Sequence, residues 1–235
     1  MREKINLVCL AFAGGNKYSY RHLFEKAPSF LKVITLEYPG RGTRMSEPFI
    51  SEMDALAEDL YRQVKDIANR ERYAIYGHSL GGLAAYLLTL KLLENDHRKP
   101  EHIFITGTTG PSSVSRTEKK RSLLPKQEFI QEIRELGGMP DEILESEDML
   151  NFLEPILRND FSLSESYLYE EGRVLDIPMT VITGSEEDME REDILLWQQE
   201  CGLQVDFRQL PGGHFFIMEH ANKLVEIISK KLVKN

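Results

Sequence analysis

The sequence has few cysteines, no long apolar run and no excess of basic residues, and each absence excludes a class of protein. Its two cysteines, Cys9 and Cys201, are too few for a disulfide framework and do not form a CxxC pair. No stretch reaches the roughly 20 apolar residues that a membrane-spanning helix needs. No small-residue cleavage site follows the short apolar run after Lys4. We therefore expect a cytoplasmic protein with no membrane association and no structural zinc.

Basic residues are outnumbered by acidic ones. The 235 residues include 29 Lys and Arg against 38 Asp and Glu, a formal net charge of −9. Such a chain has no overall positive field to attract a nucleic-acid backbone, so we expect no nucleic-acid binding. Repeats and low-complexity segments are absent as well, and the 41% hydrophobic content is typical of a folded globular protein.

Short apolar runs alternate with helical patterns along much of the chain. Leu56, Leu60 and Val64 follow helical spacing and predict a helix with one apolar face. A further helical segment is expected around residues 19–26. Strands are predicted at 5–12, 32–38, 73–79, 102–107, 177–184 and 204–210. This alternation is typical of an α/β fold, in which crossover helices cover both faces of a mostly parallel sheet.

The strand pattern is interrupted between about residues 112 and 169, where helical segments follow one another. Because strand-like runs resume afterwards, we predict one domain over residues 1–235 with a helical insertion. Apolar residues of the insertion recur at helical spacing and either form its own core, the commoner case, or line a pocket. These residues are Met139, Leu150, Phe152, Leu153 and Phe161.

Residues 77–81 read Gly-His-Ser-Leu-Gly between a predicted strand and a predicted helix, which matches the G-x-S-x-G nucleophile motif in its required context. A serine at this sharp turn has a strained backbone, and side chains two residues before and after it would collide. Gly77 and Gly81 remove those side chains. We therefore predict that Ser79 is a nucleophile, and that the amide of Leu80 donates to a developing oxyanion.

A serine hydroxyl needs a hydrogen-bonded base, which in this chain order is expected near the carboxyl end. His214 follows a predicted strand and two glycines, and is the candidate. His220 is the rival, but its place at the start of the last helix favours a capping or solvent-facing role.

The acid of such a triad is expected after the preceding strand, which leads into Glu186, Glu187 and Asp188. Aspartate is the commoner member, so Asp188 is favoured and Glu187 is the alternative. The second oxyanion donor is expected after the first strand, where Gly14 and Gly15 follow Ala13; we assign it to the Ala13 amide.

Together these segments resemble the type II thioesterases, stand-alone α/β-hydrolases that accompany nonribosomal peptide and polyketide synthases. The resemblance spans nearly the whole chain. It rests on residues 13–15, on Tyr-Pro-Gly-Arg-Gly at 38–42 with Arg44, Glu47 and Pro48 behind it, on 77–82, on 157–161, on Trp197 and on Pro-Gly-Gly-His-Phe-Phe at 211–216. It departs from the family at Ala11-Phe12, where members often have Pro-His, and at the Glu-Glu-Asp acid loop, which is often Asp-Asp.

The resemblance implies a triad of Ser79, Asp188 and His214, an oxyanion hole from Ala13 and Leu80, and a mobile lid formed by the insertion. The implied substrate is an acyl thioester on the phosphopantetheine arm of an acyl or peptidyl carrier protein, hydrolysed so that synthases blocked by a wrong acyl group are freed for antibiotic biosynthesis. Such chemistry needs no metal or cofactor, and we expect a monomer.

Two other functions fit the same residues. A general serine esterase or lipase acting on free esters or acyl coenzyme A would share the triad, and a non-catalytic interaction module could keep the fold. A carrier protein is usually acidic, so a docking surface needs local apolar or basic patches. The candidate basic cluster is Arg116, Lys119, Lys120 and Arg121, although a solvated charge run is the commoner explanation. Arg41 and Arg44 are expected to anchor their loop by pairing with carboxylates.

Overall fold

A computed structural model describes residues 3–233. Its centre is a six-stranded sheet in the order β2-β1-β3-β4-β5-β6. Every neighbouring pair is parallel. The strands are β1 (Ile5–Leu10), β2 (Leu31–Thr35), β3 (Tyr73–His78), β4 (Ile103–Thr106), β5 (Met179–Gly184) and β6 (Asp206–Leu210). All six predicted strands are confirmed, because each apolar run is buried on both faces of the sheet or lies at its edge.

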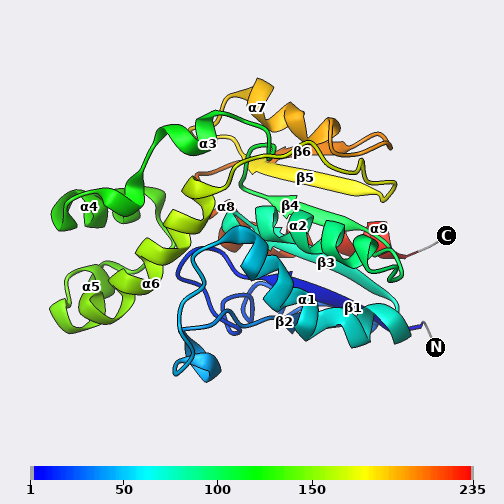
Figure 1. Ribbon diagram of the computed structural model, residues 1–235, viewed down its shortest axis with the longest axis horizontal. Helices are drawn as coiled ribbons and strands as arrows, with labels where there is room; N and C mark the ends of the chain where they lie inside the picture. Colours follow the sequence, from blue (N-terminus) through cyan, green and yellow to red (C-terminus); the bar gives the residue numbers. More distant parts are fainter. Residues whose placement is uncertain (1–2, 234–235) are drawn as a thin grey trace.

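Alternate residues of the strands contribute to two cores on opposite faces. In β1, Val8 and Leu10 face one core while Leu7 and Cys9 face the other. Helix α1 (Met53–Arg70) and helix α2 (Leu80–Glu94) cover the first face, and α9 (Ala221–Leu232) covers the second (Figure 1). Leu56, Leu60 and Val64 are fully buried on α1, as their spacing predicts.

A helical insertion, here defined as α3 to α6, lies between β4 and β5 and projects to the left of the sheet in Figure 1. It consists of α3 (Ser115–Glu118), the short 3₁₀ helix η2 (Arg121–Leu123), α4 (Lys126–Leu136), α5 (Asp141–Leu144) and α6 (Glu147–Ser166). It has a small core of its own, formed by Phe129, Ile133, Leu144, Leu150 and Leu157. The strand pattern disappears from the sequence here because these apolar side chains follow helical spacing.

The remaining elements are short and connect the sheet to its edges. They are the 3₁₀ helices η1 (Gly42–Arg44) and η3 (Leu196–Gln198), and the helices α7 (Arg191–Leu195) and α8 (Phe216–Glu219). Residues 19–26 form consecutive turns rather than the expected helix. Tyr20, Leu23 and Phe24 are buried there against the second core, so tertiary packing fixes a segment too short to be a stable helix alone. No helix within residues 3–233 is long and apolar enough to cross a membrane.

Candidate active site

Ser79 occupies the sharp turn between β3 and α2. Its backbone has φ 56° and ψ −120°, a strained conformation for a residue with a side chain. Its amide donates to the Thr106 carbonyl at 2.8 Å, which joins the turn to β4. A Cβ on Gly77 would overlap the Gly81 carbonyl, and one on Gly81 would overlap the Leu10 carbonyl. The two glycines are therefore a steric requirement of the turn, as the sequence indicates.

His214 lies beside this serine, although the two are 135 residues apart. Its Nε2 is 3.0 Å from Ser79 Oγ, and its Nδ1 is 2.6 Å from Glu187 Oε1. A carboxylate only accepts hydrogen bonds, so the ring proton sits on Nδ1 and the Nε2 lone pair faces the serine hydroxyl. This is the tautomer that a general base needs.

The carboxylate at His214 belongs to Glu187, not to the favoured Asp188. The Glu187 side chain is 3% exposed, and its Oε2 accepts the Gly184 amide at 2.6 Å. Asp188 is exposed to solvent. The turn that follows β5 points residue 187 toward the histidine and residue 188 away from it, so the position in the turn, and not the commoner residue type, selects the partner.

The other histidines near the site have structural contacts. His78 is fully buried, its Nδ1 lies 3.0 Å from Thr106 Oγ1, and burial holds its pKa well below the usual range. His220 Nε2 lies 3.0 Å from the Pro211 carbonyl. His220 occupies the N-cap position of α9 but its side chain makes no capping hydrogen bond to that helix, so the predicted capping role is not seen.

Two amides beside Ser79 are free to donate. Leu80 begins α2, where the first amides of a helix have no partner within the helix, and Ala13 follows β1 in the loop before Gly14. Neither amide donates to an acceptor among residues 3–233. Ala13 also lines the cavity at Ser79. The structure thus leaves both predicted donors available.

A cavity of about 350 Å³ opens between Ser79, His214 and the helical insertion. Its lining has no Asp, Glu, Lys or Arg from the described part of the chain. The large apolar side chains around it are Phe12, Ile133, Leu136, Met139, Pro140, Ile143, Leu153, Leu157, Phe161, Phe215 and Met218. The site can therefore hold an uncharged apolar group beside the serine.

Of the five insertion residues that the sequence offers for a pocket, Met139, Leu153 and Phe161 line this cavity. Leu150 belongs to the insertion's own core, and Phe152 is 52% exposed. Phe12, at the position where the sequence departs from the thioesterase pattern, lines the cavity and packs edge-on against Phe215 at 5.0 Å. The aromatic side chains of Phe12 and Phe215 therefore line the cavity next to Ala13.

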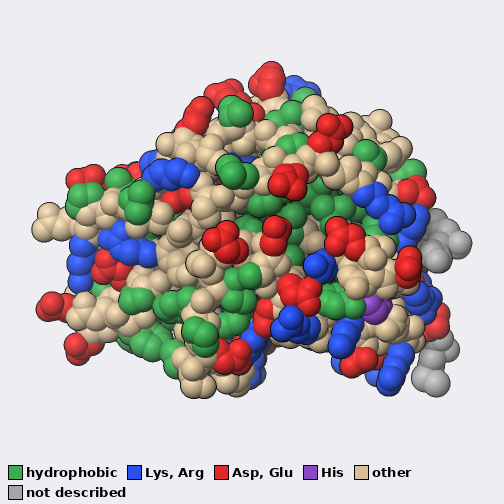
Figure 2. Space-filling view, viewed as in Figure 1, with side chains coloured by type: hydrophobic (Ala, Val, Ile, Leu, Met, Phe, Trp, Pro, Cys, Tyr) green, Lys and Arg blue, Asp and Glu red, His purple; other side chains and the backbone are tan. Residues whose placement is uncertain are grey.

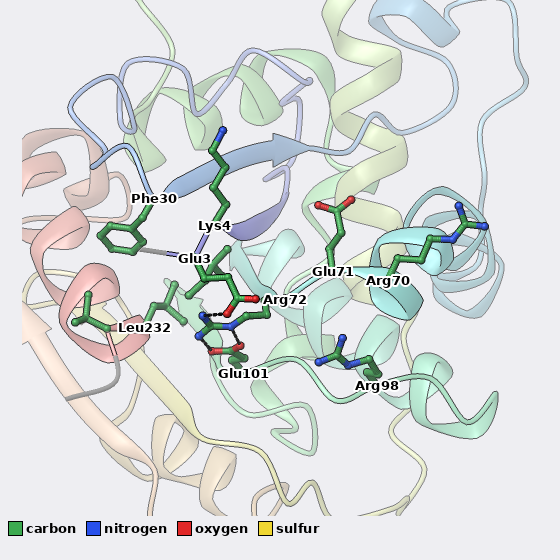
Figure 3. A pocket seen from close by; sticks show the side chains of 11 residues that line it. Glu3, Lys4, Phe30, Arg70, Glu71, Arg72, Arg98, Glu101 and Leu232 are labelled. Carbon is green, nitrogen blue, oxygen red and sulfur yellow. Dashed lines mark hydrogen bonds and ion pairs between the residues drawn. The ribbon is translucent and has the colours of Figure 1, made fainter. Parts of the chain in front are cut away.

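A second hollow, about 740 Å³ in volume, lies at the opposite end of the sheet (Figure 3). Charged side chains line much of it, and Arg72 bonds to both Glu101 and Glu3 there. In parallel α/β sheets the ligand site lies at the carboxyl ends of the strands, where Ser79 and His214 are. The smaller, apolar cavity is thus the candidate site.

The predicted basic cluster is not a free patch. Lys119 and Arg121 both pair with Glu132, at 2.6 and 3.0 Å, and Lys120 donates to the Glu165 carbonyl. Figure 2 shows Lys and Arg side chains beside acidic ones over the insertion. Arg116 points inward and donates to Thr108 Oγ1 at 2.7 Å, and burial lowers its pKa to about 10. These cations hold the insertion together.

A sequence model of the thioesterase domain family matches residues 5–232. The chain belongs to the thioesterase family. This thioesterase is 28% identical to the gramicidin S biosynthesis protein GrsT of Aneurinibacillus migulanus, over 97% of this chain and 89% of GrsT. It is 28% identical to the medium-chain S-acyl fatty acid synthase thioesterase of Rattus norvegicus, over 92% of this chain and 83% of the rat protein.

Solved structures agree with this assignment. The type II thioesterase BorB from the borrelidin biosynthetic cluster superposes with a TM-score of 0.89 at 26% identity, covering 99% of this chain and 94% of BorB. ClbQ from the colibactin nonribosomal peptide and polyketide pathway superposes with a TM-score of 0.91 at 29% identity, covering 98% of this chain and 97% of ClbQ. The fold of this thioesterase is therefore that of the α/β-hydrolases. The enzyme is a serine hydrolase that acts on thioesters.

Proposed function

We propose that this thioesterase removes acyl groups from the phosphopantetheine arms of carrier proteins that serve a nonribosomal peptide or polyketide synthase. The observation that carries the proposal is the hydrogen-bonded series Ser79, His214 and Glu187 at the wall of an apolar cavity. The biosynthetic pathways named for GrsT and BorB support the choice of carrier-bound thioesters. Release of an unproductive acyl group would return the carrier thiol to use.

In the first step, the Ser79 hydroxyl attacks the thioester carbonyl carbon and its proton passes to His214 Nε2. The carbonyl oxygen becomes an oxyanion, which accepts hydrogen bonds from the Ala13 and Leu80 amides. His214 then carries a positive charge, which the carboxylate of Glu187 stabilises at Nδ1 over 2.6 Å.

In the second step, the carbon–sulfur bond breaks and the carrier thiol leaves with the proton from His214. The acyl group remains on Ser79 Oγ as an ester. Water then attacks this ester, with His214 again taking a proton, and the products are a carboxylic acid and free Ser79. Every proton moves between the substrate, water, Ser79 and His214, so the role of Glu187 is to accept a hydrogen bond from His214 Nδ1.

The cavity favours acyl groups that are uncharged and apolar. Burying a carboxylate or an ammonium group among side chains such as Ile133, Leu153 and Phe161 would cost several kcal/mol, since no opposite charge lines the cavity. Each buried methylene, in contrast, contributes about 0.8 kcal/mol. The name of the rat relative, a medium-chain thioesterase, is consistent with this preference.

The proposed function predicts a clear order of substrates. An octanoyl group on a carrier protein should be hydrolysed at least about tenfold faster, in kcat/KM, than acetyl or malonyl groups on the same carrier, because only the octanoyl chain fills the apolar wall. Steady-state release of the carrier thiol measures all three. Preference for nitrophenyl octanoate over the octanoyl carrier would instead identify a general esterase.

Two basic residues on a different segment from the predicted cluster are close in sequence to a residue that lines the cavity. Ser19 lines the cavity, and Lys17 and Arg21 lie on either side of it in the sequence. Within residues 3–233 neither forms an ion pair with a carboxylate. Lys17 Nζ lies 5.0 Å from the centre of the Tyr18 ring, which is 59% exposed. In a chain of net charge −9, this segment offers positive charge to an acidic carrier beside the site.

Reversing these charges should weaken carrier recognition without changing the chemistry. We expect the double variant K17E/R21E to raise KM for an octanoyl carrier about 5- to 10-fold, and to leave kcat/KM for octanoyl N-acetylcysteamine, a small uncharged thioester, within about twofold. The matched control K32E/K65E makes the same charge change at exposed residues of β2 and α1. An equal rise in KM for the two double variants would refute a specific docking role.

A further inference from the structure

A buried ion pair lies directly under the loop that carries the Ala13 amide. Asp160 on α6 is fully buried, and Arg41, from the loop after β2, is 3% exposed. The guanidinium and carboxylate meet as a two-pronged pair, with nitrogen–oxygen distances of 2.5 and 2.6 Å. The sequence predicts that Arg41 pairs with a carboxylate; the structure supplies Asp160, which lies 119 positions away.

Both members of the pair also bond to the backbone of this loop. Asp160 Oδ2 accepts the Gly14 amide at 2.8 Å, and Arg41 donates to the Gly15 carbonyl at 3.2 Å. Gly14 has φ +75°, a left-handed conformation. The pair therefore fixes the Gly14 amide and the Gly15 carbonyl. The Gly15 amide in turn donates to the Phe12 carbonyl at 2.9 Å, and that carbonyl lies in the same peptide plane as the Ala13 amide.

Helix α6 also contacts this loop through an apolar side chain. Leu157 lies one turn before Asp160 on α6 and lines the cavity. A Cβ added to Gly14 would lie 2.5 Å from Leu157 Cδ2, so the loop backbone and this side chain are in close contact. Helix α6 thus contacts the loop with both a charged and an apolar side chain.

Stability alone is a poor explanation for these charges. A buried ion pair loses its hydration, and well-packed apolar residues in its place are often as stable or more so. Arg41 Nε has no hydrogen-bond partner among the described residues, which adds to that cost. What the pair provides and an apolar contact does not is directional hydrogen bonding to Gly14 and Gly15.

We propose that Asp160 and Arg41 are positioning residues that hold the Ala13 amide where the oxyanion forms. The proposal rests on the proposed function, in which Ala13 and Leu80 are the two oxyanion donors. The ion pair acts only through the loop backbone, since it does not line the cavity. It makes the insertion part of the catalytic machinery, because α6 supplies the carboxylate.

The variant Asp160→Asn tests this role, since asparagine keeps the size of the side chain and removes its charge. We expect kcat for octanoyl N-acetylcysteamine to fall about 10- to 100-fold, with KM within about threefold, because a misplaced donor weakens binding of the transition state more than of the substrate. Octylboronic acid forms a tetrahedral anionic adduct with serine, so its inhibition constant should rise with the loss in kcat. Inhibition by octanol, which forms no adduct, should stay the same.

Two further variants keep the test decisive. Asp160→Asn alone leaves an unpaired guanidinium and could unfold the protein for that reason. The double variant D160N/R41M removes both charges, and it should show the same loss in kcat and in boronate affinity. Asp59→Asn is the matched control, since Asp59 pairs with Arg44 at 2.6 Å without contacting Gly14 or Gly15. It should keep wild-type kcat.

The outcomes separate this proposal from the proposed function. If the wild type is active and D160N/R41M has the same kcat, the positioning role is overturned. A fall in kcat with unchanged octylboronic acid inhibition would also overturn it, because the oxyanion donor would then be intact. A wild type that does not hydrolyse the thioester at all would instead refute the proposed function.

Discussion

Replacing Ser79 with alanine should lower kcat for an octanoyl thioester by about 10⁴-fold or more, since the attacking oxygen is lost and only binding and the oxyanion donors remain. The fold should persist, because the strained turn depends on Gly77 and Gly81 and not on the hydroxyl. Thiol release under steady-state conditions measures the rate, and thermal unfolding checks the fold.

The proposed acyl-enzyme intermediate gives this expectation a second readout. Mass spectrometry after brief incubation with an octanoyl carrier should find the acyl mass on the peptide that contains Ser79 in the wild type, and no such mass in Ser79→Ala. Turnover that survives the substitution, or acylation of another residue, would mean that the nucleophile lies elsewhere.

Glu187→Gln should reduce kcat about 10³- to 10⁴-fold. An amide at this position can donate a hydrogen bond to Nδ1 of His214, which drives the ring proton to Nε2. The nitrogen that faces Ser79 Oγ at 3.0 Å then no longer accepts the serine proton. The carboxylate that balances the charge on His214 is lost in the same variant. Steady-state kinetics on an octanoyl thioester measure the effect.

The neighbouring residue provides a matched control for this variant. Asp188→Asn makes the same change from carboxylate to amide one position away, on an exposed side chain, and should keep kcat within about twofold. If Asp188→Asn lowers kcat more than Glu187→Gln does, Asp188 is the acid of the triad, as the sequence alone favours. Equal and small effects in both variants would mean that neither carboxylate assists His214 in catalysis.

Several features of this enzyme were predictable because one local rule decides each of them. Strands β3 and β5 are wholly buried apolar runs, and Gly77 and Gly81 are needed whenever a serine occupies that turn. Chain order alone then brings His214 to the same edge of the sheet, since the strand ends of a parallel sheet meet there.

Other features depend on distant parts of the chain and could not be read locally. Three acidic residues follow Gly184, and the direction of one turn decides which of them contacts His214. The cations of the insertion look like a free run in the sequence, but Glu132 on α4 neutralises two of them. The partner of Arg41 is fixed only when α6 packs under the loop after β1.

The order of elements divides the enzyme into two parts with different freedom to vary. Ser79, Glu187 and His214 lie at strand ends whose spacing is set by sheet register, whereas Ile133, Met139 and Ile143 come from a segment inserted between β4 and β5. The residues that select the acyl group can therefore change during evolution while the residues at the strand ends stay the same. Helix α6 is the exception, because Asp160 ties it to the Gly14 amide, so this helix is expected to diverge the least of the insertion.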